Sequence, residues 1–238
     1  MPEVLAVVPA RGGSKGLPGK NVMILDGRPL VAWAVAAALA ARSVGRVVGS
    51  TDDPAIAEAL RAAGAEVPFL RPPDLALDST RDAPVFLHVL DMLSLDGYRP
   101  DIVVNVRPTA PLRTGPDIDA AVAILVGRPE CRSVKSVSVC GEHPYKMWLL
   151  DGDEPLRPLL PEWHTRYGGE VDLPRQALPP VYRSNGAVDA VRVDALRETG
   201  TFHPGPIAAF VLDPARSIDI DTADDLLLVE RHLREVRA

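Results

Sequence analysis

The stretch that decides the fold is VLAVVPARGG, residues 4–13. Its first five residues form a continuous apolar run that ends at Pro9, which is typical of a strand buried on both faces of a parallel sheet. A glycine-rich loop, residues 11–21, follows this strand directly. Ligands of open α/β sheets bind at the carboxyl ends of strands, so the loop is a candidate binding site.

Helix and strand patterns alternate after the loop. Residues 54–63 predict a helix that Asp53 could cap and Gly64 could end. We therefore expect an α/β fold: a doubly wound, mostly parallel, Rossmann-like sheet with helices on both faces. Its predicted strands are residues 4–8, 44–50, 67–70, 102–106 and 134–140, and the other predicted helices are residues 30–41, 83–95, 118–126 and 223–236. A regular pattern also returns at residues 187–193 and 207–212.

Seven prolines interrupt this rhythm between residues 143 and 183. Proline removes a backbone donor and breaks helices and central strands, so this segment cannot continue the sheet. We expect residues 1–238 to form a single domain from which residues 143–183 protrude as a small lobe.

Composition limits the classes of protein to which the chain can belong. The 238 residues suffice for one domain with a continuous core, and no apolar run approaches the roughly 18 residues of a membrane span. The start, Met1-Pro2-Glu3, lacks the basic region of a signal peptide, so a cytoplasmic location is expected. A formal net charge of −6 argues against binding nucleic acid through a broad positive face. Any phosphate chemistry must use a local cluster of cations.

The loop at residues 11–21 offers such a cluster. Glycines let backbone N–H groups approach phosphate oxygens closely, and cations add charge, so the loop predicts a triphosphate cradle. Its spacing matches neither a P-loop nor a dinucleotide fingerprint, and the alternative is a flexible surface turn with solvated charges. The glycines are Gly12, Gly13, Gly16 and Gly19, and the cations are Arg11, Lys15 and Lys20.

Near the end of the chain, Asp219 and Asp221 are two residues apart. On a strand they would point the same way and could hold one hard cation, for which Mg²⁺ is the expected ion. The alternative is a pair of strand-end or capping acids before the helix that begins at Ala223.

Further motifs run along nearly the whole chain: STD (residues 50–52), LRP (70–72), RPTAPLR (107–113), HPYK (143–146), PRQ (174–176), NGA (185–187) and SIDIDT (217–222). Together with the loop, they resemble the CMP-sialic acid synthetases, a family of cytidylyltransferases. The resemblance implies a nucleotidyltransferase that uses CTP and Mg²⁺ to attach CMP to an acidic 2-keto sugar of the sialic-acid type, with release of pyrophosphate. It also implies a homodimer built through the lobe at residues 143–183.

The resemblance also implies which residues form the functional site. Lys20, Asp219 and Asp221 are implied as catalytic, with the two aspartates holding the metal that bridges the CTP phosphates. Arg71 and the turn at residues 80–82 match the place where the family recognises cytosine, although Arg71 could be a surface cation and Asp82 a helix N-cap. The implied nucleotide-binding residues are Arg11, Gly12, Gly13, Lys15, Lys20, Asn21, Arg71 and Thr80.

The sugar half of the site is implied by a second group, which suits a carboxylate but could also be a solvated charged surface. Its members are Arg107, Lys146, Arg175, Gln176 and Asn185. Arg113 could face the ligand or pair with an acid on a helix. The implied reaction is in-line attack of the anomeric hydroxyl on the α-phosphate, without a covalent enzyme intermediate.

Two residues depart from the family pattern. The family often has glutamine where this chain has Arg107, and usually tyrosine where it has Asp189. Asp189 either faces the acceptor and favours a hydroxyl or amine, or forms a salt bridge with Arg183 or Arg192. These departures keep two other functions open: cytidylyl transfer to another acid, such as a 3-deoxy-octulosonate-like sugar or a phosphonate, and nucleotide binding without turnover.

Overall fold

A computed structural model describes residues 1–13, 16–168 and 173–237. The chain divides into two compact units: Met1–Val137 together with Ser184–Ala238, and Ser138–Arg183. Each unit is described by itself.

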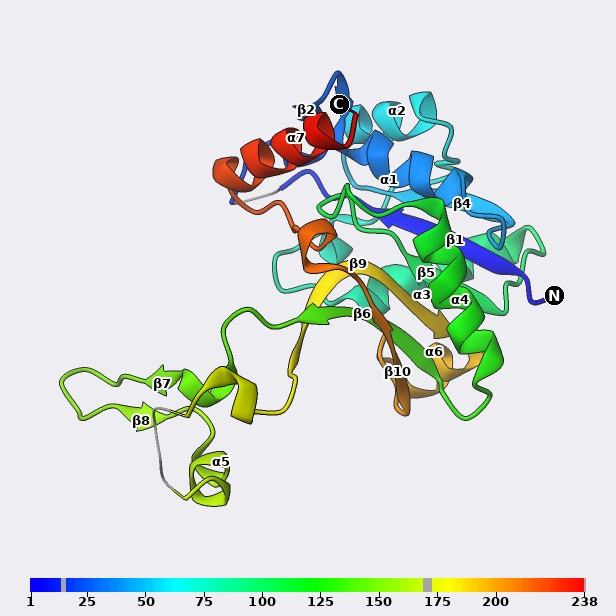
Figure 1. Ribbon diagram of the computed structural model, residues 1–238. Coiled ribbons are helices and arrows are strands. Elements are labelled where there is room, and N and C mark those ends of the chain that lie inside the picture. The colour runs from blue at the N-terminus through cyan, green and yellow to red at the C-terminus, as the bar shows by residue number, and fades with distance from the viewer. Residues whose placement is uncertain (14–15, 169–172, 238) are drawn as a thin grey trace. The chain divides into compact units, whose positions relative to one another are not determined.

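The larger unit is built on a six-stranded sheet with the order β10-β6-β9-β5-β1-β4 (Figure 1). β1 runs parallel to β4 and β5, and β10 runs parallel to β6, whereas β9 is antiparallel to β5. The expectation of a mostly parallel sheet is therefore confirmed. The strands are β1 (Val4–Pro9), β4 (Arg46–Ser50), β5 (Ile102–Asn105), β6 (Ser133–Val139), β9 (Tyr182–Arg192) and β10 (Ile207–Val211).

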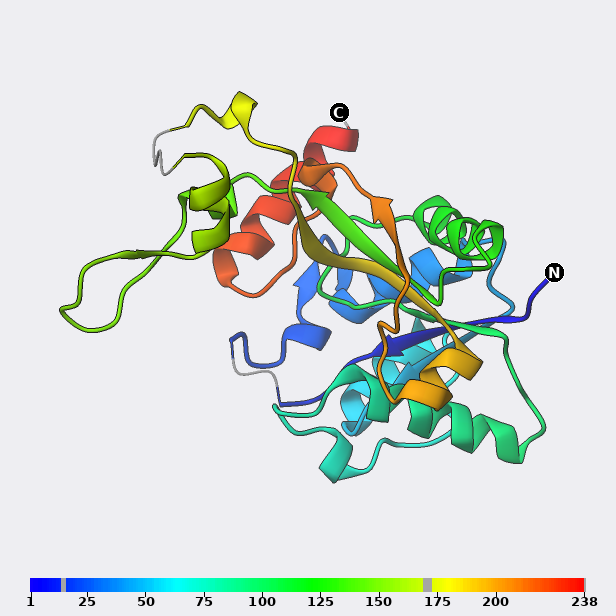
Figure 2. The ribbon, with the colours of Figure 1, turned by 90° about the horizontal axis from the view of Figure 1, so that it is seen from below.

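Helices cover both faces of this sheet, as Figure 2 shows. One face packs against α1, α2 and α4, and the other against α3 and α6. The apolar run of β1 is continuous because both faces of the strand are buried. Val4, Ala6 and Val8 pack in the core on the side of α1, α2 and α4, and Leu5 and Val7 pack in the core on the side of α3 and α6. The helices are α1 (Leu30–Leu39), α2 (Pro54–Ala62), α3 (Asp82–Leu95), α4 (Gly115–Gly127), α6 (Val193–Thr199) and α7 (Ala223–Arg237).

Short elements connect the larger ones and shape the loops at the carboxyl ends of the strands. After β1 come a 3-10 turn and a two-strand hairpin, and further 3-10 turns precede α3 and α7. They are η1 (Lys20–Val22), β2 (Ile24–Leu25), β3 (Arg28–Pro29), η2 (Pro73–Leu75) and η5 (Pro214–Arg216).

One predicted strand is absent from the structure. Residues 67–70 form no ladder, and the only pairing near them is a bridge between Val48 and Glu66 within the described residues. Pro68 explains this, because proline has no N–H to donate to a neighbouring strand. The segment before α7 that carries Asp219 and Asp221 is also irregular rather than a strand.

The smaller unit contains two short strands, one helix and two 3-10 turns in its described part. Its core is aromatic: Tyr145 is buried and stacks on His164 with ring centroids 4.5 Å apart, and Trp148 and Tyr167 add edge contacts. Its elements are η3 (Pro144–Lys146), β7 (Trp148–Leu149), β8 (Arg157–Pro158), α5 (Pro161–Arg166) and η4 (Arg175–Ala177). Across the described ranges of both units, no helix combines the length and apolar character that crossing a membrane requires.

Candidate functional site

The loop after β1 is held by polar contacts at its two ends. The buried Asn21 donates from Nδ2 to the carbonyl oxygen of Arg11 at 2.9 Å, and the Gly12 N–H donates to Asp52 Oδ1 at 3.0 Å. A Cβ on Gly12 would lie 2.9 Å from Asp53 Oδ2, so this position admits only glycine without a shift of Asp53, whereas a Cβ on Gly13 would meet nothing within 4 Å. Lys15, expected to bind phosphate, lies outside the described residues.

Asp53 lies beside Gly12 and caps α2, as the sequence predicts. Its carboxylate accepts from the backbone N–H groups of Ala55 and Ile56 at 2.7 and 3.2 Å. Loop and helix are therefore coupled through one carboxylate, because Asp53 caps α2 with Oδ1 and limits the space beside Gly12 with Oδ2.

A cavity of about 260 Å³ lies beside this loop. Its apolar lining comes from Pro9, Leu75, Leu77 and Val85, and its polar lining from Arg11, Arg71, Asp78, Thr80, Asp82 and Arg107. Arg11 forms an ion pair with Asp78 at 2.6 Å, and Thr80 Oγ1 donates to the carbonyl oxygen of Asp74 at 3.3 Å. Apolar walls with a few convergent polar groups are typical of a small-molecule site.

Arg71 is buried, so the interpretation as a surface cation is wrong. It is 6% exposed and donates from Nε to Ser50 Oγ at 3.1 Å and from Nη2 to the Ser50 carbonyl at 2.6 Å. Burial lowers the pKa of Arg71 to about 10, although the charge of Asp52 acts in the opposite direction. The guanidinium therefore stays charged at neutral pH beneath the cavity.

Asp82 does not cap α3, because it is the first residue of that helix and the capping position falls on Arg81. Its Oδ2 accepts instead from Asn105 Nδ2 at 3.3 Å and from Arg107 Nη2. A carboxylate in the first turn still suits the positive end of the helix dipole.

Arg107 and Asp189, the two departures from the family pattern, bind each other. Arg107 Nη1 donates to Asp189 Oδ2 at 2.7 Å. Asp189 thus forms a salt bridge, as one alternative expects, but its partner is Arg107 and not Arg192, which donates to the carbonyl oxygens of Cys131 and Leu125. Burial raises the pKa of Asp189, but the hydrogen bond with His203 and the charge of Arg107 outweigh it and lower that pKa to about 2.

Lys20 and Asp221 are 201 residues apart in sequence and in contact in the structure. Lys20 Nζ donates to Asp221 Oδ1 at 3.0 Å and to the Ile220 carbonyl at 2.7 Å. The lysine side chain is 11% exposed and that of Asp221 is 74% exposed. The end of the glycine-rich loop is therefore fixed to the aspartate segment.

Asp219 lies in the same segment but in different surroundings. The segment is anchored by Ile220, whose side chain enters a small core under α7 and whose N–H donates to the Thr109 carbonyl at 2.8 Å. A Cβ on Gly186, which has a φ of +64°, would lie 3.6 Å from Asp219 Oδ2. Asp219 Oδ1 is buried and has no hydrogen-bond partner among the residues that the structure describes.

These aspartates fit a magnesium ion by their chemistry. Mg²⁺ in phosphate-transfer sites is bound by one or two carboxylates together with substrate phosphates and water, so a protein cage of three or more ligands is not needed. Within the described ranges, no three His, Cys, Asp or Glu residues lie close enough together to hold a metal ion by themselves. The unpartnered oxygen of Asp219 is a ready ligand atom, and the exposed Asp221 is a second carboxylate in the same segment.

Asn185 and Arg113 connect the neighbouring segments. Asn185 is buried and donates from Nδ2 to Ser217 Oγ at 3.0 Å, which ties β9 to the segment of the aspartates. Arg113 is also buried and donates from Nη1 to the carbonyl oxygens of Arg107 and Ala110 at 2.8 and 2.7 Å. Burial, reinforced by the charge of Arg107, lowers the pKa of Arg113 to about 9. Within the described residues, the hydrogen bonds of this guanidinium go to backbone carbonyl oxygens and not to an acid on a helix.

Three predicted sugar-binding residues belong to the smaller unit, where all are exposed. Lys146 lies in η3, and Arg175 and Gln176 lie in η4, with Arg175 Nη2 donating to the Cys140 carbonyl at 3.1 Å. Their role with a sugar stays a prediction.

Sequence reasoning missed His203. Its Nε2 lies 3.4 Å from Asp189 Oδ2 and 3.2 Å from Lys135 Nζ. It also lines a second cavity of about 390 Å³, which shares Thr80 and Asp82 with the first. No spacing in the sequence signals this contact, because it arises from the packing of β6 and β9 with the segment before β10.

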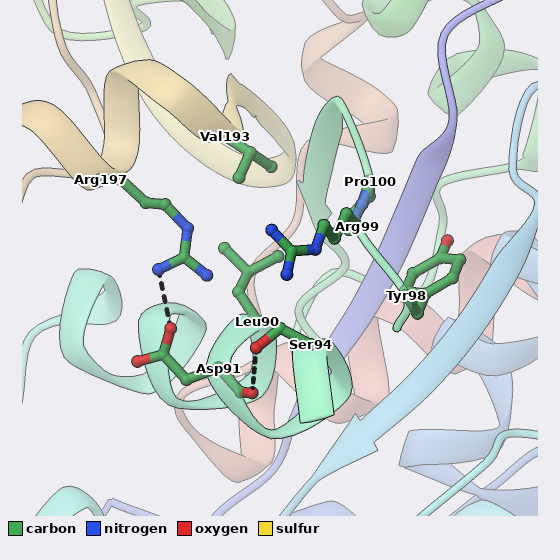
Figure 3. A pocket seen from close by; sticks show the side chains of 8 residues that line it. All are labelled: Leu90, Asp91, Ser94, Tyr98, Arg99, Pro100, Val193 and Arg197. Carbon is green, nitrogen blue, oxygen red and sulfur yellow. Dashed lines mark hydrogen bonds and ion pairs between the residues drawn. The ribbon is translucent and has the colours of Figure 1, made fainter. Parts of the chain in front are cut away.

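A third cavity, of about 300 Å³, lies further along α3 and is drawn in Figure 3. Arg197 and Arg99 point toward it, and Arg197 forms an ion pair with Asp91 at 2.7 Å. Asp91 is nine residues beyond Asp82, roughly 13 Å along the helix at about 1.5 Å per residue. This cavity is therefore separate from the candidate site.

Comparison with known proteins identifies the family of the chain. The model of a protein family described as cytidylyltransferase matches residues 5–146. The CMP-N,N'-diacetyllegionaminic acid synthase of Legionella pneumophila is 35% identical over 96% of this chain and 95% of its own length. An N-acylneuraminate cytidylyltransferase of Streptococcus agalactiae is 28% identical over 96% of this chain and 53% of its own length.

The fold also matches a solved structure, that of a CMP:2-keto-3-deoxy-manno-octonic acid synthetase complexed with CTP. The TM-score is 0.70 at 18% identity, over 98% of this chain and 99% of the other. The chain belongs to the cytidylyltransferase family. Within that family it stands with the CMP-sialic acid synthetases, as its motifs predict.

Proposed function

We propose that this chain transfers CMP from CTP to the anomeric hydroxyl of an acidic 2-keto sugar of the nonulosonate type and releases pyrophosphate. The observation that carries the proposal is the contact between Lys20, at the end of the glycine-rich loop, and the segment of Asp219 and Asp221. Phosphoryl transfer needs cations and metal-binding carboxylates around one triphosphate, and this contact brings both together.

The nucleotide half of the site is the cavity of about 260 Å³ beside the loop. We infer that the base enters between its apolar walls, with Arg71 beneath it and Thr80 at its edge. Arg11 and Lys20 would then face the phosphates, together with backbone N–H groups of the loop. Asn21 acts indirectly, because its amide holds the Arg11 carbonyl and so the start of the loop.

Asp219 and Asp221 are the residues that would hold Mg²⁺. When bound, the ion neutralises charge on the triphosphate and on the departing pyrophosphate. Lys20 holds Asp221 in place and adds a second positive charge beside the same phosphates. The sugar hydroxyl attacks the α-phosphate in line, so orientation by these groups supplies the catalysis.

Within the larger unit, the acceptor half is proposed to include Arg107 and the segment around Asn185. We also propose a homodimer through the smaller unit, acting in the cytoplasm. The support for a dimer is the apolar surface that the unit exposes, because so many large apolar side chains in one short segment favour a protein contact. They are Met147, Trp148, Leu149, Leu150, Leu156 and Leu159.

Pyrophosphate release from CTP tests this function. The purified chain is incubated with CTP, Mg²⁺ and one sugar at a time: N-acetylneuraminate, N,N'-diacetyllegionaminate, 3-deoxy-manno-octulosonate and, as a control, the neutral N-acetylmannosamine. Release with a nine-carbon acidic sugar and none with the neutral sugar is the expected result. Tight CTP binding without release from any sugar would identify a nucleotide-binding protein without turnover.

A further inference from the structure

Asp225 lies in the first turn of α7 and holds the backbone on both sides of Asp221. One of its oxygens, Oδ2, accepts from the Asp221 N–H at 3.1 Å and from the Thr222 N–H at 2.8 Å. These two N–H groups flank the Cα of Asp221, so the φ and ψ angles of that residue lie between two fixed points. Asp225 therefore limits the direction in which the Asp221 carboxylate points.

A helix cap accounts for only part of this arrangement. Thr222 Oγ1 also donates to Asp225 Oδ2 at 2.7 Å, and the Asp225 N–H donates back to Thr222 Oγ1 at 3.3 Å. Together with the bond from the Thr222 N–H, these contacts form a capping box, which stabilises the start of a helix. The bond from the Asp221 N–H lies one residue further upstream and is not part of a capping box. It extends the contacts of α7 to one of the two aspartates that would bind Mg²⁺.

Other contacts fix the backbone before Asp221. The Ile220 carbonyl accepts from Lys20 Nζ at 2.7 Å, and the Ile220 side chain packs with Val229 of α7 in the small core. Since the chain is held on this side, the bonds to Asp225 fix the other side. Without Asp225, rotation at Asp221 would be the main freedom left to the segment.

Asp225 is placed to support a metal ligand and not to be one. Its Oδ2 already accepts three hydrogen bonds. In the described part of the chain no three acids, histidines or cysteines lie close enough to hold an ion, so Asp225 does not join Asp219 and Asp221 in a group of three ligands. The hydrogen bond from the Thr222 side chain is the main cause that lowers the pKa of Asp225, which is therefore a charged acceptor at neutral pH.

We propose that Asp225 is the positioning residue of the metal site and orients Asp221 for Mg²⁺ through the backbone, without contact to the ion. Partners that orient metal ligands are worth about 10–100-fold in metal affinity. The inference rests on the proposed function, because it names the residue that arranges the metal site before the ion binds.

Metal binding by the full-length protein tests the proposal. Asp225→Ala removes the acceptor, and Asp225→Asn keeps an amide oxygen in nearly the same place. Asp224→Asn is the matched control, because it removes the neighbouring charge in the same turn from an exposed side chain. Binding of the Mn²⁺–CTP complex is measured without an acceptor by water proton relaxation, which responds strongly to Mn²⁺ on the protein and weakly to Mn²⁺ on free CTP. The melting temperature and the Mg²⁺ dependence of pyrophosphate release complete the set.

The three variants should differ in affinity for the Mn²⁺–CTP complex. Asp225→Ala should raise the dissociation constant at least about tenfold, because binding must then order Asp221. Asp225→Asn should raise it less, about threefold, since a neutral oxygen accepts the same N–H groups more weakly. Asp224→Asn should change it less than about twofold, because salt screens an exposed charge. The melting temperature of Asp225→Ala should fall by about 1–8 °C through loss of the helix cap.

Excess Mg²⁺ separates positioning from ligation. At saturating Mg²⁺, Asp225→Ala should recover most of the kcat of the wild type, because the bound ion itself then fixes Asp221. Asp219→Asn removes a ligand and should not recover. If Asp225→Ala folds poorly, Asp225→Asn and Asp224→Asn still carry the comparison.

Four results would overturn the proposal. An unchanged affinity in Asp225→Ala would make Asp225 a helix cap only, and equal losses in all three variants would show an effect of charge alone. A loss of kcat that excess Mg²⁺ does not restore would make Asp225 a ligand. A wild type that does not bind the Mn²⁺–CTP complex would reject the metal site itself. A wild type that binds the complex but turns over no acceptor would reject only the proposed function, and the affinities would still decide the role of Asp225.

Discussion

Replacing Lys20 by methionine should destabilise the protein more than replacing its partner Asp221 by asparagine. The lysine side chain is 11% exposed and makes two contacts, to the Ile220 carbonyl at 2.7 Å and to Asp221 at 3.0 Å. Methionine keeps most of the aliphatic stem but neither contact. Asparagine at position 221 removes only the charge of a side chain that is 74% exposed.

The two contacts of Lys20 differ in energy. A hydrogen bond from a charged group to a carbonyl contributes about 1.5–3 kcal/mol, and an ion pair with an exposed carboxylate about 0–1 kcal/mol. Lys20→Met should therefore cost about 2–3 kcal/mol, or about 4–12 °C in melting temperature for a chain of this size. Asp221→Asn should cost no more than about 1 kcal/mol, or about 4 °C.

Thermal unfolding followed by circular dichroism at neutral pH measures both values, and pyrophosphate release measures turnover. Both variants should lose most of their turnover, because each removes a charge next to the phosphates. Added salt should shrink the small effect of Asp221→Asn, since the exposed pair is screened. Equal losses of melting temperature in the two variants, or none in Lys20→Met, would refute this account of how Lys20 holds the aspartate segment.

Four further results are expected. Asp219→Asn should lower turnover on the order of 10²-fold with the fold intact, and a fully active variant would place the metal elsewhere. CTP with Mg²⁺ should raise the melting temperature more than ATP or GTP does, and equal shifts would argue against a pyrimidine site. Light scattering at micromolar concentration should give a dimer, and a monomer would contradict the role proposed for Ser138–Arg183. Gly12→Ala should displace Asp53 and weaken the cap of α2, lowering the melting temperature by about 2–4 °C, whereas Gly13→Ala, which has open space, should not.

The fold was largely readable from the sequence because its signals are local. The apolar run of β1, the alternation of elements and the cap at Asp53 each depend on neighbouring residues. The direction of β9 was not readable, because apolar pattern reports burial and not strand orientation. The strand predicted at residues 67–70 failed for a reason that was visible in the sequence, the missing donor of Pro68.

The site was only partly readable. The spacing of residues in the sequence predicts the glycine-rich loop and the pair of aspartates. The contact between Lys20 and Asp221 could not be predicted in this way, because the two residues are 201 positions apart and meet only in the folded chain. The burial of Arg71 depends on its packing against Ser50 at the end of β4, and the pairing of Arg107 with Asp189 depends on the register of β5 and β9, and no single motif records either. Asp189→Tyr alone should disrupt folding, because the side chain that it replaces is buried and paired with Arg107.

The central claim is the transfer of CMP from CTP to an acidic sugar, and phosphorus NMR of the reaction tests it most directly. With CTP, Mg²⁺ and a nonulosonate, a phosphodiester signal of the CMP-sugar should appear together with pyrophosphate in equal amounts, and neither should appear without the sugar. Orthophosphate or CDP as the product, or pyrophosphate formed at the same rate without any sugar, would contradict the account.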